Sequence, residues 1–171
     1  MPILDNSKVA EVLERIRLLE SMHVKVGVIS STGGQMLMIA NVHEFGCDIP
    51  VTDKMRGFFI YNFGVALRAD TKVIKIPERS FIRSSFDSKG DQVGDQGERL
   101  LDQVVNGDLP VKAFYDLLGQ TSVNAIRNFL IQNVTSPANV ALTIANKGGK
   151  SNPLVDTGRL VGSIDYEIVG G

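Results

Sequence analysis

Two segments of alternating hydrophobicity lie near opposite ends of the 171-residue chain and constrain its fold most strongly. Residues 24–30 read VKVGVIS, and residues 163–169 read SIDYEIV. Successive side chains point to opposite faces of a β-strand, so a period of two predicts strands with one buried face. We expect both segments in one sheet, and that sheet needs helices packed on its apolar face.

A glycine-containing turn follows the first alternating segment. "SSTGG" leads into the apolar run of residues 35–40, and two apolar runs around such a turn are typical of a β-hairpin. The sequence therefore predicts a hairpin over residues 24–40. Gly33 and Gly34 do not indicate a phosphate-binding loop, because the GxxxxGKS/T pattern is absent and a strand is expected where that loop needs a helix.

Helical periodicity supplies the covering layer. Apolar residues recur at i, i+3, i+4 and i+7 between Ser7 and Met22, and Asn6 or Ser7 is a suitable N-cap. Side chains that can cap further helices are Thr52 or Asp53 and Asp156 or Thr157. The additional helices predicted from these signals and from Pro110 span residues 53–67, 110–134 and 158–163.

These elements together predict one α+β domain over residues 1–171. A short strand at residues 71–76 ends at Pro77, which has no amide proton to continue a ladder. The expected architecture is an antiparallel or mixed sheet packed against helices, built from the hairpin 24–40, the strand 71–76 and the C-terminal strand 163–169.

Two polar segments interrupt the regular pattern. Residues 87–99 hold three glycines among many charges, so we expect either a loop or a poorly formed helix, and the most mobile internal part of the chain. Residues 145–152 contain "NKGGKSN" and are expected to form a flexible loop.

Composition excludes several classes of protein. The 18 basic and 19 acidic residues nearly cancel, which disfavours a dedicated nucleic-acid binder and suits a protein that meets other proteins. Cys47 is the only cysteine, so no internal disulfide can form. The N-terminal residues lack the pattern of a signal peptide, and no apolar run approaches the roughly 20 residues that span a bilayer. We expect a protein made in the cytosol, with no membrane partner.

No catalytic, metal-binding or cofactor-binding residue is predicted. His43 and Glu44 lack the second histidine of H-E-x-x-H, where Cys47 stands instead. A Cys47 nucleophile with His43 as its base is a hydrolase alternative, but no orienting carboxylate accompanies the pair. The D-T-G of residues 156–158 matches aspartic proteases in three letters only, and a helix cap explains the same letters.

Two arginines in "ERSFIR" suggest a second alternative. Arg79 and Arg83 lie four residues apart, on one face if the segment is helical. Ion pairing within the subunit or across an interface is the favoured interpretation. The alternative is a nucleic-acid-binding module in which these arginines act with the lysines of residues 147–150.

Three motifs form an ordered set. They are "VHEFG" at residues 42–46, "IPERSFIR" at 76–83 and "PLVDTGRLVGSI" at 153–164. In this order and spacing they resemble the neck and tail-completion proteins of tailed bacteriophages, which include virion morphogenesis, head–tail joining and minor tail proteins of the Mu G-like and lambda Z-like kind. The matching positions are His43, Glu44, Phe45, Gly46, Ile76, Pro77, Arg79, Phe81, Arg83, Asp156, Thr157, Gly158, Arg159 and Leu160.

The resemblance implies a structural virion protein and no enzymatic activity. Such a protein is made in the host cytoplasm and works at the neck or upper tail, where it forms a ring and joins the tail to the head. Its expected partners are copies of itself and neighbouring head-connector, tail-terminator or tail-tube proteins. DNA in the channel is a further expected contact, without sequence specificity. No cofactor or metal is implied, and the motif positions are expected at interfaces.

Overall fold

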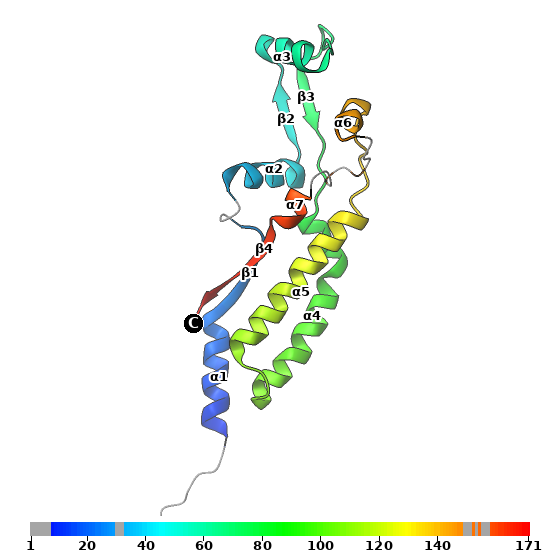
Figure 1. The fold of residues 1–171 in the computed structure, drawn as a ribbon. Coiled ribbons are helices and arrows are strands. Elements are labelled where there is room, and N and C mark those ends of the chain that lie inside the picture. The colour runs from blue at the N-terminus through cyan, green and yellow to red at the C-terminus, as the bar shows by residue number, and fades with distance from the viewer. Residues whose placement is uncertain (1–7, 30–32, 149–151, 153, 155–157) are drawn as a thin grey trace, which may run out of the picture.

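The computed structural model describes residues 8–29, 33–148, 152, 154 and 158–171, and it shows an elongated molecule (Figure 1). The fold is α+β, with small antiparallel sheets packed with helices, as the sequence predicts. The elements are α1 (Val9–Ser21), β1 (Met22–Val28), α2 (Gly34–Phe45), β2 (Cys47–Pro50), α3 (Asp53–Phe63), β3 (Val73–Ile76), α4 (Ile82–Asn106), α5 (Val111–Gln132), α6 (Ala141–Asn146), α7 (Arg159–Gly162) and β4 (Ile164–Gly170).

The two alternating segments form one antiparallel pair. β1 pairs with β4 from Met22 opposite Gly170 to Val28 opposite Ile164. Helix α5 packs against both strands and covers one face of this ribbon. The first and last strands of the described chain therefore form one sheet, and α5, which lies between them in the sequence, packs on it.

The hairpin predicted over residues 24–40 is wrong in its second half. Residues 34–45 form helix α2, and the hydrogen-bond partner of β1 is the distant strand β4. In α2 the buried residues Met36, Ala40 and Glu44 recur every four positions, the spacing of one helix face. Gly33, with φ of 90°, precedes the helix where the hairpin turn was expected.

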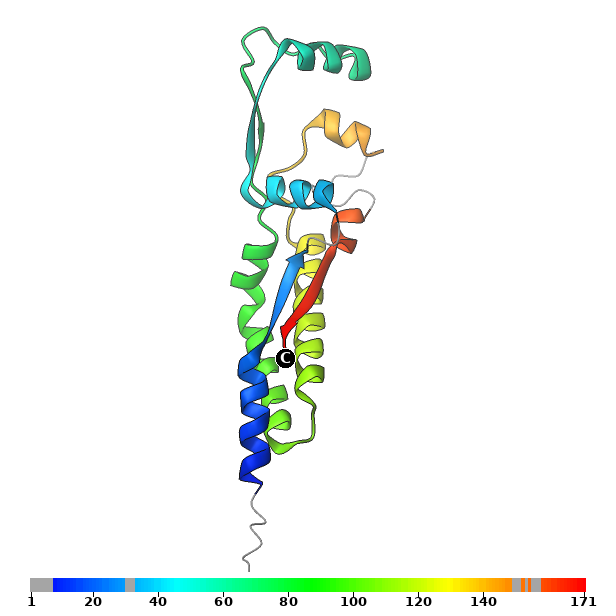
Figure 2. The ribbon, with the colours of Figure 1, turned by 90° about the vertical axis from the view of Figure 1, so that its left-hand side faces the viewer.

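Strand 71–76 lies in a second sheet, and not in the sheet of the C-terminal strand. β3 pairs antiparallel with β2, a strand that the sequence did not predict. We call residues 47–76 the arm: β2 and β3 rise from the end of α2 and carry α3 at their far end (Figure 2). The predicted cap of α3 is confirmed, since the Thr52 hydroxyl accepts a hydrogen bond from the Met55 N–H at 3.3 Å.

The loop considered for residues 87–99 is wrong as well, because the whole segment lies within α4. Its three glycines line one side of a helix that packs along α5, where a Cβ at Gly97 would lie 3.6 Å from Leu118. Tertiary contact therefore outweighs the low helix propensity of glycine. Of the other polar segment, residues 145 and 146 end α6, and residues 149–151 lie outside the described part.

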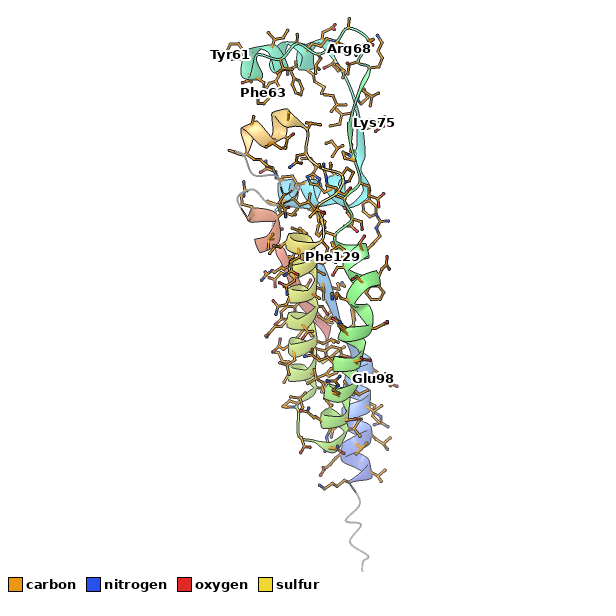
Figure 3. The ribbon with its side chains drawn as sticks, turned by 90° about the vertical axis from the view of Figure 1, so that its right-hand side faces the viewer. Tyr61, Phe63, Arg68, Lys75, Glu98 and Phe129 are labelled. Atoms are coloured by element: carbon orange, nitrogen blue, oxygen red, sulfur yellow. The ribbon has the colours of Figure 1, made fainter. Side chains whose placement is uncertain are left out.

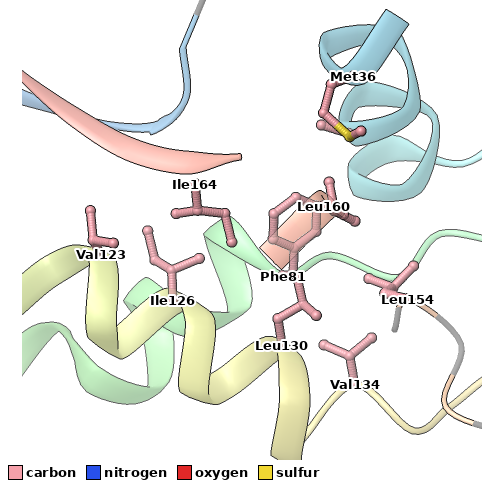
Figure 4. Close-up of a cluster of buried hydrophobic side chains, with 10 residues drawn as sticks. Met36, Phe81, Val123, Ile126, Leu130, Val134, Leu154, Leu160 and Ile164 are labelled. Carbon is pink, nitrogen blue, oxygen red and sulfur yellow. The ribbon is translucent and has the colours of Figure 1, made fainter. Parts of the chain in front are cut away.

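The main core fills the space between α2, α4, α5, α7 and β4 (Figure 4). Phe81, Leu130 and Ile164 are fully buried at its centre. A second, smaller cluster of Val104, Val111 and Phe114 lies where α4 and α5 meet.

Several expectations concern the ends of elements and the membrane. The caps proposed at Asn6, Ser7, Asp156 and Thr157 lie outside the described residues, and Gly158 is the N-cap of α7. Within the described ranges, no helix has the length and hydrophobicity to cross a membrane.

Helix α5 approaches the sheet so closely that only glycine fits at one position. A Cβ at Gly119 would overlap the Tyr166 ring. We predict that Gly119→Ala lowers the free energy of unfolding by about 1–3 kcal/mol, because the ring of Tyr166 must move. The measurement is urea denaturation. In the matched control, Gly94→Ala, the new Cβ meets nothing within 4 Å, and stability should rise by up to about 1 kcal/mol. Equal effects of the two changes would contradict this account.

Candidate functional site

The Glu44 carboxylate is the centre of the site. It stands in the last turn of α2, is 5% exposed, and accepts hydrogen bonds from the backbone N–H groups of Phe81 (2.8 Å), Ile82 (3.0 Å) and Arg83 (3.0 Å). The Ser80 hydroxyl donates a further bond at 2.8 Å. The first N–H groups of a helix have no partner within it, so a carboxylate from elsewhere can cap them. Glu44 therefore caps α4 from a distance of almost 40 residues in the chain.

The Arg83 side chain also binds Glu44. Its Nε donates to Glu44 Oε1 at 3.1 Å, and its Nη2 donates to the Glu44 carbonyl at 2.6 Å and to Glu78 Oε1 at 2.8 Å. The guanidinium carbon lies 4.7 Å from the centre of the Phe45 ring, a cation–π contact. The first two motifs therefore hold each other.

The glycine of "HEFG" permits the close approach of these two segments. Gly46 has φ of 72°, and a Cβ there would lie 3.0 Å from the Glu78 nitrogen and 3.1 Å from the Ile76 carbonyl oxygen. A side chain at this position would meet backbone atoms that cannot move aside. We call Glu44, Gly46, Glu78, Ser80 and Arg83, with the N–H groups they bind, the Glu44 junction.

Arg79 is turned into the protein. Its side chain donates from Nε to the Pro137 carbonyl at 2.8 Å and from Nη2 to the Ala138 carbonyl at 3.3 Å, and the residue is 7% exposed. Its backbone N–H donates to the His43 carbonyl at 2.8 Å. Arg79 thus connects the segment after α5 to the segment between β3 and α4. Although Arg79 and Arg83 both belong to "ERSFIR", they bind different groups and do not form one phosphate clamp.

The third motif joins the first two through the main core. Leu160, at 7% exposure, and the fully buried Phe81 belong to the same apolar cluster (Figure 4). Gly158 and Arg159 border a pocket that Pro77 also lines. Asp156 and Thr157 lie outside the described residues. We call the part of the molecule outside the arm the body. The structure therefore brings the described positions of all three motifs to the end of the body from which the arm projects.

That pocket has a volume of about 510 Å³ and a cationic lining. Its described basic residues are Lys75, Arg79, Lys147 and Arg159, and no described acidic residue lines it. Burial lowers the pKa of His43, and the positive charges of Arg79 and Lys147 lower it further. His43 Nδ1 is buried and has no hydrogen-bond partner.

The pKa of Glu44 reflects two opposing effects. Burial favours the protonated acid and acts to raise the pKa, but the hydrogen bonds from the Arg83, Ile82 and Phe81 N–H groups and from the Ser80 hydroxyl outweigh it and lower the pKa. In return, the hydrogen bond to Glu44 and the charges of Glu78 and Glu44 outweigh desolvation and raise the pKa of Arg83. Glu44 is therefore held as an anion, and its lone pairs are occupied by donors.

The Glu44 carboxylate holds two segments of the chain together. A carboxylate whose hydrogen bonds are saturated is a poor general base. In the described ranges, no group of three or more His, Cys, Asp or Glu side chains could hold a metal ion. The unpartnered Nδ1 of His43 also lacks the orienting acceptor that a Cys47–His43 hydrolase would use.

One surface was not identified as functional from the sequence. Helix α3 buries no residue, and it exposes Phe58 (53%), Ile60 (55%), Tyr61 (90%) and Phe63 (38%). The signal was present in "FFIYNF", because a helix that is apolar on most sides is normally covered. Only the structure shows that α3 lies at the end of the arm, away from the core.

Comparisons with protein-family models, with curated proteins and with solved structures gave no significant match.

Removing the Glu44 carboxylate should destabilise the protein. Glu44→Ala leaves the N–H groups at the start of α4 without acceptors, and we predict a loss of roughly 2–4 kcal/mol in the free energy of unfolding. The measurement is urea denaturation at neutral pH. The matched control Glu78→Gln changes a half-exposed partner of the same arginine and should cost less than about 1 kcal/mol. A loss as small for Glu44→Ala would contradict the capping role.

The pH dependence gives a separate prediction. Because the folded-state pKa of Glu44 lies below its ordinary value of 4.5, the ionised carboxylate stabilises the fold above that value, and the contribution is lost as the pH falls through the folded pKa. Glu44→Gln, which mimics the protonated acid, should be less stable than the wild type at neutral pH. The difference should shrink below pH 4.5. Denaturation curves across this range measure it, and a difference that stays constant would contradict the prediction.

Proposed function

We propose that this chain is a structural virion protein of a tailed bacteriophage, which acts without enzymatic activity at the head–tail junction as a neck or tail-completion protein. It assembles with copies of itself into a ring and joins the tail to the head. The observation that carries the proposal is the arm, because a projecting helix with four exposed large apolar side chains requires a covering partner.

The motif residues support this proposal because they hold the arm in a fixed position. Both ends of the arm pass through the Glu44 junction: β2 follows Gly46 directly, and β3 leads through Glu78 and Ser80 into α4. The junction thus fixes the direction in which the arm leaves the body. A ring requires such a fixed angle, because each subunit must meet the next with the same rotation.

The proposed partners follow from the resemblance of the three motifs to those of phage neck and tail-completion proteins. They are further copies of the chain and the adjoining head-connector, tail-terminator or tail-tube proteins in the virion, after synthesis in the host cytoplasm. Contact with DNA in the channel would be without sequence specificity. Arg79 and Arg83 do not favour a dedicated nucleic-acid-binding module, since their guanidinium groups are engaged with carbonyls and carboxylates of the chain itself.

Loss of the gene tests the proposal. A phage that carries this gene should, when the gene is inactivated, produce filled heads and separate tails that fail to join, as seen by negative-stain electron microscopy. Supplying the wild-type chain in trans should restore joined, infectious particles, and cryo-electron microscopy of these particles should place the protein at the neck. Normal, infectious particles without the protein would overturn the proposal.

A further inference from the structure

We propose that the arm of one copy docks its α3 helix into a groove between β1 and α4 of a second copy. The inference rests on the proposed ring assembly and names the two surfaces that make the contact. One surface is helix α3, which exposes Phe58, Ile60, Tyr61 and Phe63 around most of its circumference. The other is an apolar groove on the body.

The arm presents its helix in a preformed state. Thr52 caps the start of α3, and Gly64 ends it in the left-handed conformation. The Arg56 guanidinium donates to three carbonyls of the following loop, those of Leu67 (3.3 Å), Arg68 (2.9 Å) and Thr71 (2.7 Å). The rings of residues 58, 59 and 63 also contact one another, with centroids 5.7–6.1 Å apart. An ordered surface loses little conformational entropy when it binds.

The groove on the body is apolar and open. It has a volume of about 550 Å³, and its floor and walls come from β1, α4 and α5. One wall of the groove lacks side chains at three positions of α4 that are three or four residues apart, Gly90, Gly94 and Gly97. A Cβ at Gly94 would meet nothing within 4 Å. Phe86, 74% exposed, stands beside them. The apolar residues that line the groove are Val24, Val26, Ile82, Phe86, Val93, Leu118, Ala125 and Ile126.

The arm and helix α4, which forms one wall of the groove, carry net charges of opposite sign, and on this ground we take a second copy as the occupant; the one charged residue that lines the groove itself is Lys89. The arm, residues 47–76, holds five basic and three acidic residues, a net charge of +2. Helix α4 holds five acidic and three basic residues, a net charge of −2, and one of those three is Arg83, already paired with Glu44. Charges of opposite sign steer two surfaces together and fix their orientation.

The carboxylates of α4 follow a single face of the helix. Their spacing of four, four, three and four residues places them beside the glycines that line the groove. All are exposed, and within the described part of the chain none takes part in a salt bridge. They are Asp87, Asp91, Asp95, Glu98 and Asp102.

The arm cannot reach the groove of its own chain. Tyr61 lies at one end of the molecule, and Glu98 lies far along α4 on the other side of the Glu44 junction (Figure 3). A contact between two different surfaces leaves one arm and one groove free after each step. Such heterologous contacts add subunits in one direction and close into a ring when the rotation allows.

Two variants of the full chain separate the surfaces. Gly94→Leu fills the groove, and Tyr61→Ser removes an exposed anchor from the arm. Each should weaken self-association at least about tenfold, the effect of losing one central contact residue, as measured by sedimentation velocity at low salt. The matched controls are Gln92→Leu, which adds leucine to an exposed position of α4 outside the groove, and Met38→Ser, at an exposed apolar position of α2. Both controls should associate as the wild type does.

Mixing the variants gives the decisive measurement. The Tyr61→Ser chain keeps an intact groove and the Gly94→Leu chain keeps an intact arm, so an equimolar mixture should form one-to-one dimers that grow no further. A wild type that stays monomeric at every concentration, variants that associate like the wild type, or a mixture without dimers would overturn the proposal. An unchanged mass of Tyr61→Ser together with lost binding of double-stranded DNA would identify nucleic acid as the partner of the arm and would also overturn it.

The failure of this contact and the failure of the proposed function are distinguishable. If particles without the protein do not join but Gly94→Leu associates normally, the arm–groove contact is wrong and the function stands. If the mixture forms dimers while particles without the protein are normal, the contact stands and the head–tail function is wrong.

Discussion

The Glu44 carboxylate is the interaction on which the rest of the structure depends. It is buried at the end of α2, where it accepts hydrogen bonds from the first N–H groups of α4 and from the Arg83 guanidinium. Burying a carboxylate is costly unless donors surround it, so the contact forms only when both segments are correctly placed. The arm lies between α2 and α4 in the sequence. The Glu44 carboxylate therefore fixes the start of α4 and both ends of the arm.

The molecule divides its apolar residues between a core and an exposed surface. The body buries Phe81, Leu130 and Ile164 completely, whereas α3 at the end of the arm has no buried residue. The arm is therefore positioned by polar contacts at its base and by hydrogen bonds of its own, rather than by a core. In the proposed ring, a neighbouring copy would cover the apolar surface that the arm leaves exposed.

Much of the candidate site was predictable as a set of residues, but not as a set of roles. The order of the three motifs in the sequence identified Glu44, Gly46 and Arg83 together. Their tasks as cap, close-contact glycine and ion-pair partner depend on a contact between segments almost 40 residues apart, which no local pattern contains. The glycines of residues 87–99 favoured a loop by propensity, yet packing against α5 and the distant cap stabilise a helix there.

The sequence by itself determined the local periodicities. It gave correct positions for α1, α3, α5, β1, β3 and β4 to within a few residues, because the spacing of apolar side chains and the capping residues act over a single turn or strand. The tertiary structure alone decided the partners. β1 pairs with β4 across most of the chain, and the apolar run at residues 35–40 becomes helical, because its buried face meets the core rather than a neighbouring strand. Hydrogen-bond partners and buried faces are properties of the folded chain, because they join segments that lie far apart in the sequence.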